Sequence, residues 1–122
     1  MKNIILPIKP EYSQKIFNNE KRFEYRTRVP NKKIEKIFVY ETFPTKKIVG
    51  YFYVDQIIKH PINQMWNLTH ELGGIDYAKF FNYFKDSEFA YAYKIKKVVK
   101  FKKPLSLQKF GINFPPQSYI YL

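Results

Sequence analysis

Apolar and polar residues alternate over several short runs of this chain, and this alternation is typical of β-strands. Successive side chains of a strand point to opposite faces, so a half-buried strand repeats every two residues. Runs rich in Ile, Val, Phe and Tyr predict strands at residues 4–8, 23–28, 34–42, 48–58, 88–102 and 117–122. Pro44-Thr45 predicts a turn between two of these strands, and Gly50 predicts a bulge or a close backbone approach within one of them.

Three stretches between the strands predict short helices. The first begins at Pro10, because proline fits the first helical turn, and ends at Asn18-Asn19, because Asn tolerates the left-handed cap conformation. The second covers residues 61–72 and ends at Gly73-Gly74, and Asp76 can cap the third. An aromatic stripe at helical spacing favours core packing for the third helix. The residues of this stripe are Tyr77, Phe80, Phe81 and Phe84.

The order of these elements predicts an α+β chain that is mainly β. Long antiparallel strands with few short helices favour a small β-barrel with short peripheral helices, since closure would hide the apolar edges of the sheet. Residues 104–110 predict one more turn of helix before the last strand. No linker, repeat or low-complexity tract interrupts the 122 residues, so we expect a single domain over residues 1–122.

The net charge suggests a class of partner. Lys and Arg number 22 against 10 Asp and Glu, which gives a formal net charge of +12. A field of this sign attracts polyanions, and nucleic acid is the commonest of them. The alternative is that lysine only keeps the surface soluble. Aromatic residues make up 20% of the chain, so a single Tyr or Phe carries little weight as a functional signal.

Several classes of site are excluded or disfavoured by what the sequence lacks. It has no cysteine, which excludes disulfides and thiolate metal sites. His60 and His70 have no metal-site spacing, and no phosphate loop or dinucleotide fingerprint is present, so we expect neither a metal nor a cofactor. No apolar run suits a signal peptide or approaches the ~20 residues of a membrane span. We therefore expect a soluble, cytoplasmic protein without a membrane partner.

One charged segment has the chemistry of a small polar site. In an extended chain Glu24 and Arg26 point the same way, and Lys21 lies at the preceding turn. The carboxylate would orient the guanidinium, whose planar fork suits a phosphate or the edge of a base. The alternative is a solvated charged turn.

The long strand at residues 88–102 adds a candidate track for phosphates. Strict alternation places a row of ammonium groups on its outer face. This row consists of Lys94, Lys96, Lys100 and Lys102. Trp66, in the apolar helical insert, either packs or stacks on a base.

The arrangement around the charged segment resembles the signature of ASCH domains, a family of the PUA-like superfamily. An apolar strand ends in Ile8-Lys9-Pro10, a short helix follows, and then comes the Lys21-x-x-Glu24-x-Arg26 run. Further similar parts are Ile37-Phe38-Val39-Tyr40 before Pro44, Val49-Gly50 before residues 51–58, and the tail Pro115-Pro116-Gln117-Ser118-Tyr119. The resemblance covers nearly the whole chain and is typical of small stand-alone prokaryotic or phage members.

This resemblance implies a PUA-like barrel with a cleft at Lys21, Glu24 and Arg26. Relatives in the superfamily bind RNA, often at modified or unpaired bases, and ASCH domains are proposed regulators of transcription or translation. We therefore expect a binder of RNA, single-stranded nucleic acid or a modified nucleoside. Further residues expected at the cleft are Lys9, Tyr40, Thr42, Gln117 and Ser118.

The resemblance also implies an alternative activity. Some ASCH members are amidohydrolases that deacetylate acetylated cytidine with a Lys, a Thr nucleophile and a Glu. This sequence keeps Lys21, but Glu24 occupies the position of the nucleophile, Thr27 faces away from it in a strand, and Glu71 is the nearest acid to the family Glu. The carboxylate at position 24 favours binding, with Lys21 and Glu24 as the catalytic pair if hydrolysis occurs. Some relatives are also suggested to cleave RNA, and a protein-interaction module with incidental charge is a third hypothesis.

Overall fold

The computed structural model describes all residues from 1 to 122. Its elements follow the order that the sequence predicts. The strands are β1 (Lys2–Ile8), β2 (Phe23–Arg26), β3 (Ile34–Glu41), β4 (Lys47–Pro61), β5 (Phe89–Leu105) and β6 (Ile120–Tyr121). The helices are α1 (Pro10–Phe17), α2 (Ile62–Thr69) and α3 (Tyr77–Tyr83), with single 3₁₀ turns η1 (His70–Leu72) and η2 (Leu107–Phe110).

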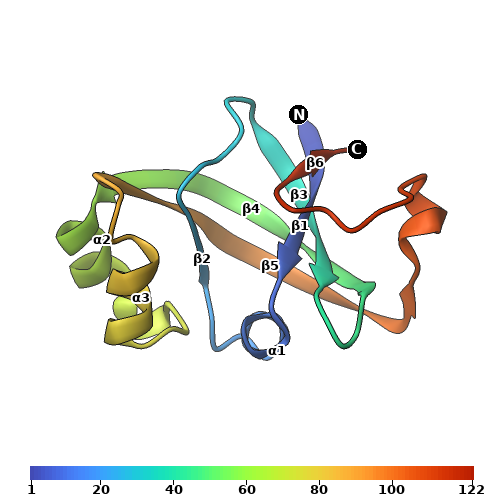
Figure 1. The fold of residues 1–122 in the computed structure, drawn as a ribbon, viewed down its shortest axis with the longest axis horizontal. Helices are drawn as coiled ribbons and strands as arrows, with labels where there is room; N and C mark the ends of the chain where they lie inside the picture. Colours follow the sequence, from blue (N-terminus) through green and yellow to red (C-terminus); the bar gives the residue numbers. More distant parts are fainter.

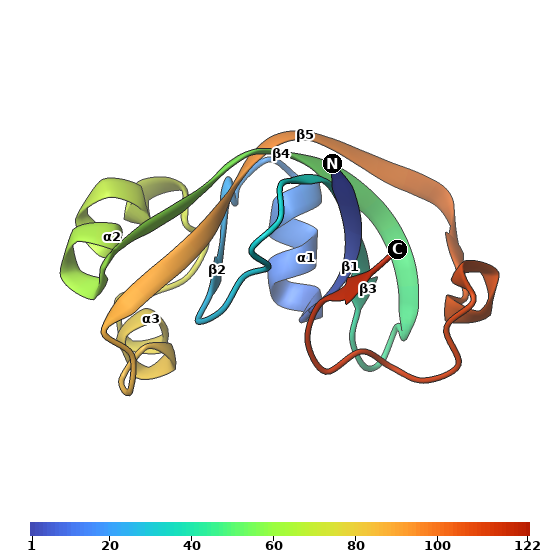
Figure 2. The same cartoon turned by 90° about the horizontal axis from the view of Figure 1, so that it is seen from above.

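All six strands form one strongly curved sheet in the order β2-β5-β4-β3-β1-β6 (Figures 1 and 2). Strands β1 and β3 are parallel, and every other neighbouring pair is antiparallel. Figure 2 shows α1 inside the curve of the sheet, α2 and α3 at one end of β4 and β5, and η2 at the other end. The predicted class, mainly β with short peripheral helices, is therefore confirmed.

The six-stranded sheet is not closed into a full barrel. The end strands β2 and β6 have no strand partner on their outer sides. A side chain links the two sides of the opening, because Arg26 Nη2 donates to the carbonyl oxygen of Pro7 in β1 at 2.6 Å. The chain therefore leaves an open edge at β2, and the space beside this edge is where the polar residues gather.

The main core fills the concave side of the sheet around α1. Its buried residues are Ile4, Leu6, Ile8, Ile16, Ile34, Ile37, Val39, Val49, Phe52, Tyr93 and Ile95. A second core, centred on Phe80 and Phe84, joins α2 and α3 to the opposite face of β2 and β5. A third core, around Leu107, joins η2 to the outer face of β1, β3 and β4. Figure 2 shows β2 between α1 and α3, and the second core packs it against α3 through Tyr25.

Local signals in the sequence account for several of the boundaries. The side chain of Asp76 accepts a hydrogen bond from Lys79 N at 2.8 Å, which confirms the predicted cap of α3. Asn19 adopts a left-handed conformation with φ 63° after α1. The register shifts at Gly50, where a Cβ atom would lie 2.8 Å from the ring of Phe17, so a close approach is confirmed.

None of the helices is of a length and hydropathy that would let it span a bilayer.

Several predicted boundaries differ because pairing partners decide how far a strand runs. Strand β4 continues past residue 58 to Pro61, which lies opposite Phe89 of β5, so the next helix begins at Ile62. Strand β5 continues through Pro104 to Leu105, since Leu105 still lies opposite Ile48 of β4. The last strand is much shorter than residues 117–122, because only Ile120 and Tyr121 pair with β1. The helical insert is also divided, with α2 ending at Thr69 before the 3₁₀ turn.

Candidate functional site

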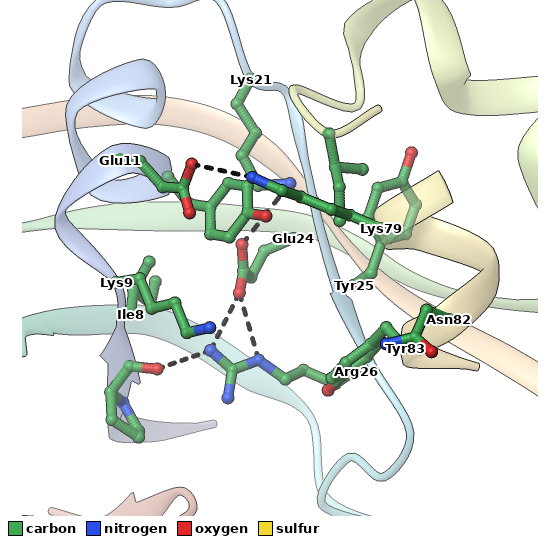
Figure 3. A pocket seen from close by; sticks show the side chains of 13 residues that line it. Ile8, Lys9, Glu11, Lys21, Glu24, Tyr25, Arg26, Lys79, Asn82 and Tyr83 are labelled. Atoms are coloured by element: carbon green, nitrogen blue, oxygen red, sulfur yellow. Dashed lines mark hydrogen bonds and ion pairs between the residues drawn. The ribbon is translucent and has the colours of Figure 1, made fainter. Parts of the chain in front are cut away.

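A pocket of about 440 Å³ lies beside the open edge of β2, between α1 and α3 (Figure 3). Three separate segments of the chain supply its walls. Strand β1 and α1 contribute Pro7, Ile8, Lys9, Glu11 and Tyr12, the β2 region contributes Lys21, Glu24, Tyr25 and Arg26, and the α3 region contributes Ile75, Lys79, Asn82 and Tyr83. Because these segments meet only in the folded chain, the pocket is a product of the fold.

Glu24 is at the centre of the charged groups in this pocket. Arg26 donates to Glu24 Oε2 from both Nε, at 3.1 Å, and Nη2, at 2.9 Å. Lys21 Nζ lies 3.7 Å from Glu24 Oε1. The side chain of Glu24 is 7% exposed, that of Lys21 3% and that of Arg26 19%. A buried carboxylate is thus placed between two cations, and the outer cation keeps contact with solvent.

The Gly73-Gly74 turn holds Lys21 in place. Lys21 Nζ donates to the carbonyl oxygen of Gly73 at 2.5 Å. Gly74 has φ 66°, and a Cβ atom there would lie 2.7 Å from Cβ of Lys21, so glycine satisfies both the backbone conformation and the close contact. Burial lowers the pKa of Lys21 from 10.5, and the nearby Glu24 carboxylate opposes this shift. The ammonium therefore loses its proton more readily than an exposed lysine does.

Two tyrosine rings flank the Lys21 ammonium. Its Nζ lies 4.7 Å from the ring centroid of Tyr25 and 5.4 Å from that of Tyr12. The Tyr25 hydroxyl is 2.7 Å from Thr69 Oγ1, and burial raises the pKa of Tyr25 to about 12. Burial, together with the charge of Glu11, also raises the pKa of Tyr12. Both hydroxyls therefore keep their protons at neutral pH.

The rim of the pocket is positively charged. Lys9 is exposed, and Figure 3 shows its side chain pointing toward the guanidinium of Arg26. Lys79 Nζ lies 3.6 Å from Glu11 Oε2 in an exposed pair. The lining holds four basic side chains and two carboxylates, which leaves a formal excess of two positive charges. The pocket is therefore suited in charge and volume to a small anionic group.

The structure brings together four of the residues that the sequence predicts for the cleft, namely Lys9, Lys21, Glu24 and Arg26. The other four lie outside the pocket. Tyr40 is buried in the third core, and Thr42 N donates to the Ile8 carbonyl oxygen at 3.0 Å. Gln117 and Ser118 are exposed in the segment before β6. Tyr40 alternates away from the concave side, which is why it joins the core under η2.

The predicted lysine row of β5 is divided between two faces of the strand. A bulge at Lys96 interrupts the pairing with β4 and reverses the alternation of side chains. Tyr93 before the bulge and Val98 after it both pack toward the main core. Lys94 therefore points away from that core, whereas Lys100, two residues after Val98, lies on the side of β5 that faces the core. The single outer row that strict alternation predicts does not form.

Sequence reasoning missed the wall that α3 contributes. Lys79, Asn82 and Tyr83 have i, i+3, i+4 spacing, so they share one helix face next to the aromatic stripe. The stripe itself is core only in part, because Phe80 and Phe84 are buried and Tyr77 is 62% exposed. The helical spacing of these three polar residues was the only sign of this wall in the sequence. The sequence does not show that this helix face lies next to β2.

The remaining candidates lie elsewhere. The ring of Trp66 stacks on that of His70 with centroids 5.0 Å apart and an interplanar angle of 19°. Glu71 is exposed and does not line the pocket. No three side chains of His, Cys, Asp or Glu are grouped so that they could hold a metal ion.

The ASCH domain family model matches residues 6–104, so the chain belongs to the ASCH domain family. The crystal structure of ASCH from Zymomonas mobilis is similar with a TM-score of 0.91 at 25% identity, over 99% of this chain and 87% of that one. A single-residue variant of that protein gives the same TM-score of 0.91.

Curated relatives differ widely in length. An ASCH domain-containing ribonuclease from Zymomonas mobilis is 26% identical over 126 residues, which cover 99% of this chain and 84% of that protein. A Ureaplasma parvum protein named ATP synthase subunit alpha is 31% identical over 120 residues, or 98% of this chain. A large ribosomal subunit protein of the same organism is 27% identical over 120 residues. This chain spans 15% and 39% of the lengths of the two Ureaplasma proteins.

Proposed function

We propose that this pocket binds one nucleotide unit of single-stranded RNA. The observation that supports the proposal is the buried arrangement in which Lys21 and Arg26 share Glu24. Such an arrangement fixes the guanidinium before a ligand arrives, so little side-chain entropy is lost on binding. A pre-oriented Arg fork beside a positively charged rim suits a phosphate more than it suits a neutral metabolite.

The phosphate would lie against Arg26 and the two rim lysines. The guanidinium uses Nε and Nη2 for Glu24 and Nη2 for Pro7, which leaves Nη1 without a partner in the protein. Lys9 has no carboxylate partner, and Lys79 pairs with Glu11 only in an exposed contact. Three donors are therefore free or easily released at the rim, and charge-assisted hydrogen bonds to phosphate are strong.

The base would occupy the wall between α1 and α3. Tyr12 and Tyr83 offer ring faces there, and Asn82 offers both a donor and an acceptor. Single-stranded RNA presents unstacked bases that stack on aromatic rings and expose their hydrogen-bonding edges. The pocket of about 440 Å³ is too small for a duplex, which favours an unpaired nucleotide.

RNA cleavage is a second candidate, and the similarity to a ribonuclease across 99% of this chain favours it. In that reaction the 2′ hydroxyl oxygen attacks the adjacent phosphorus, the 5′ oxygen leaves, and a cyclic phosphate forms. A base must take the 2′ proton and an acid must protonate the leaving oxygen. Lys21 would act as the base in its neutral form, which burial favours by lowering its pKa, and Tyr12 keeps its proton and can act as the acid. Arg26 would stabilise the charge that develops on phosphorus.

The binding proposal is tested by titrating labelled single-stranded RNA, duplex RNA and single-stranded DNA with the purified protein. Arg26→Ala should weaken the binding of single-stranded RNA about 10- to 100-fold, the loss of one or two charged hydrogen bonds. Arg28→Ala removes the same charge from an exposed position outside the pocket and serves as the matched control. Equal losses in the two variants would mean that only the overall charge attracts RNA.

The cleavage proposal is tested with end-labelled RNA, in the presence and absence of a chelator. Lys21→Met and Tyr12→Phe should each abolish formation of the cyclic phosphate while the RNA still binds. Intact RNA after long incubation with the unmodified protein would leave binding as the function. The amidohydrolase hypothesis stays a prediction, and release of acetate from acetylated cytidine in the same preparations would support it.

A further inference from the structure

The sheet continues beyond the pocket in a row of side chains that starts at Arg26. In the register of the sheet Arg26 lies opposite Tyr91 of β5, and Tyr91 lies opposite Lys59 of β4. Residues that are directly opposite share one face, with Cβ atoms about 5 Å apart. The pairing between β4 and β5 is regular from Phe89 to Tyr93, so Phe89 is on this face as well. This is the face whose Tyr93 packs in the main core, and α2 and α3 cover the opposite face.

Lys59, Phe89 and Tyr91, which we call the Lys59 cluster, combine a free cation with aromatic rings. Lys59 Nζ lies 4.5 Å from the ring centroid of Phe89 and 5.7 Å from that of Tyr91. Phe89 is 37% exposed and Lys59 is exposed, so a ligand can reach the cluster. Lys59 takes part in none of the four ion pairs of the structure, in contrast to Lys94, which pairs with Asp55.

We propose that the Lys59 cluster is a second subsite for single-stranded RNA, which binds the nucleotide next to the one in the pocket. This inference rests on the proposed binding function of the pocket and extends it from one nucleotide to a strand. Adjacent strands are about 4.8 Å apart, so the backbone at Lys59 lies roughly 10 Å from that at Arg26. A base would stack on the exposed ring of Phe89, beside the partly buried Tyr91, and the Lys59 ammonium would contact a phosphate.

Charge and ring chemistry favour RNA over an apolar protein segment here. Glu24, the carboxylate of β2 on this face, is already paired with Arg26 and Lys21. A cation held over a ring is attractive to a phosphate and repels the cationic surface of a second copy of this chain. The cluster also adjoins the pocket directly through the Arg26–Tyr91 pair, so one strand can contact both without bending around an edge.

The test compares labelled uridine monophosphate, which can occupy the pocket alone, with a labelled oligouridylate of eight nucleotides. The variants are Lys59→Ala/Phe89→Ala and, because Tyr91 is partly buried, the size-conserving Tyr91→Leu. The matched control is Lys36→Ala/Tyr53→Ala, since Lys36 Nζ lies 5.4 Å from the Tyr53 ring in the same kind of pair. Tyr53 is on the opposite face of β4, because its neighbour Phe52 packs in the main core. Thermal melts confirm that each variant is folded.

The cluster variants should bind the eight-nucleotide RNA on the order of 5- to 150-fold more weakly, the range for loss of one stacked base. They should bind the mononucleotide within about twofold of the unmodified protein, whereas Arg26→Ala weakens both lengths. Equal affinity of the cluster variants and the unmodified protein for the long RNA overturns the second subsite and leaves the pocket standing. An equal loss in the control variant also overturns it. If Arg26→Ala changes neither length, the pocket and the continuous path both fail.

Discussion

Glu24 provides the most direct test of how the pocket is built. Replacing it with Gln keeps the size of the side chain but removes the charge between Lys21 and Arg26. Lys21 is then a cation that is 3% exposed and has no carboxylate within reach, while Arg26 keeps its bond to the Pro7 carbonyl oxygen. The variant therefore tests whether the carboxylate compensates for the burial of the Lys21 ammonium.

The expected loss of stability follows from the burial of this group. Removing one partner of a fully buried ion pair costs roughly 3–5 kcal/mol. The Gln carbonyl can still accept one bond from Arg26, which is 19% exposed, so the lower end applies and we expect about 3 kcal/mol. For a chain of this size that corresponds to a fall of about 10 °C in Tm.

Urea denaturation followed by circular dichroism measures this loss. Asp55→Asn is the control, because the Asp55–Lys94 pair has a similar distance, 3.5 Å, but is nearly half exposed and should cost at most about 1 kcal/mol. The double variant Lys21→Met/Glu24→Gln should recover part of the loss, since no buried ammonium is left unpaired. A Glu24→Gln variant as stable as Asp55→Asn would refute this account of the pocket.

Three further variants test other parts of the structure. Gly74→Ala should lower the unfolding free energy in urea titrations by more than Gly111→Ala does. Both glycines have positive φ, where a Cβ atom costs about 1–2 kcal/mol, but only a Cβ atom at Gly74 would also contact Lys21. Asp76→Ala should cost about 1 kcal/mol through the lost cap of α3, again read from the urea midpoint. The unfolding free energy should rise with pH from the lowered pKa of Lys21 up to 10.5, since the unfolded chain binds more protons there, and Lys21→Met should remove this rise. Above pH 10 the raised pKa of Tyr25, about 12, makes stability fall as pH rises, because the unfolded chain ionises first.

Much of the fold could be predicted because local patterns agree with the tertiary structure. The strands follow their alternation, and Asp76 caps α3 as its residue type indicates. Whether the sheet closes could not be predicted in this way, since closure depends on hydrogen bonding between β2 and β6, which are far apart in the sequence. The bulge at Lys96 was equally hidden, because a bulge needs a partner strand with one residue fewer.

The residues of the candidate site likewise fall into those that the sequence could place together and those that it could not. The residues close in sequence, Lys21, Glu24 and Arg26, could be placed together from strand geometry, and the structure brings them together. Lys79 and Tyr83 could not, because they reach the pocket from a helix more than fifty residues further along the chain. The same distance in sequence separates Lys21 from the Gly73 carbonyl oxygen that holds its ammonium.

In a sheet that does not close, the hydrogen bond from Arg26 to Pro7 holds β2 and β1 together across the opening. Paired end strands would have filled the space that the pocket occupies. One side chain, that of Arg26, instead connects the two sides of the opening. A ligand that draws Arg26 away from Pro7 would release the two sides of the opening, and binding would then change the breadth of the entrance itself.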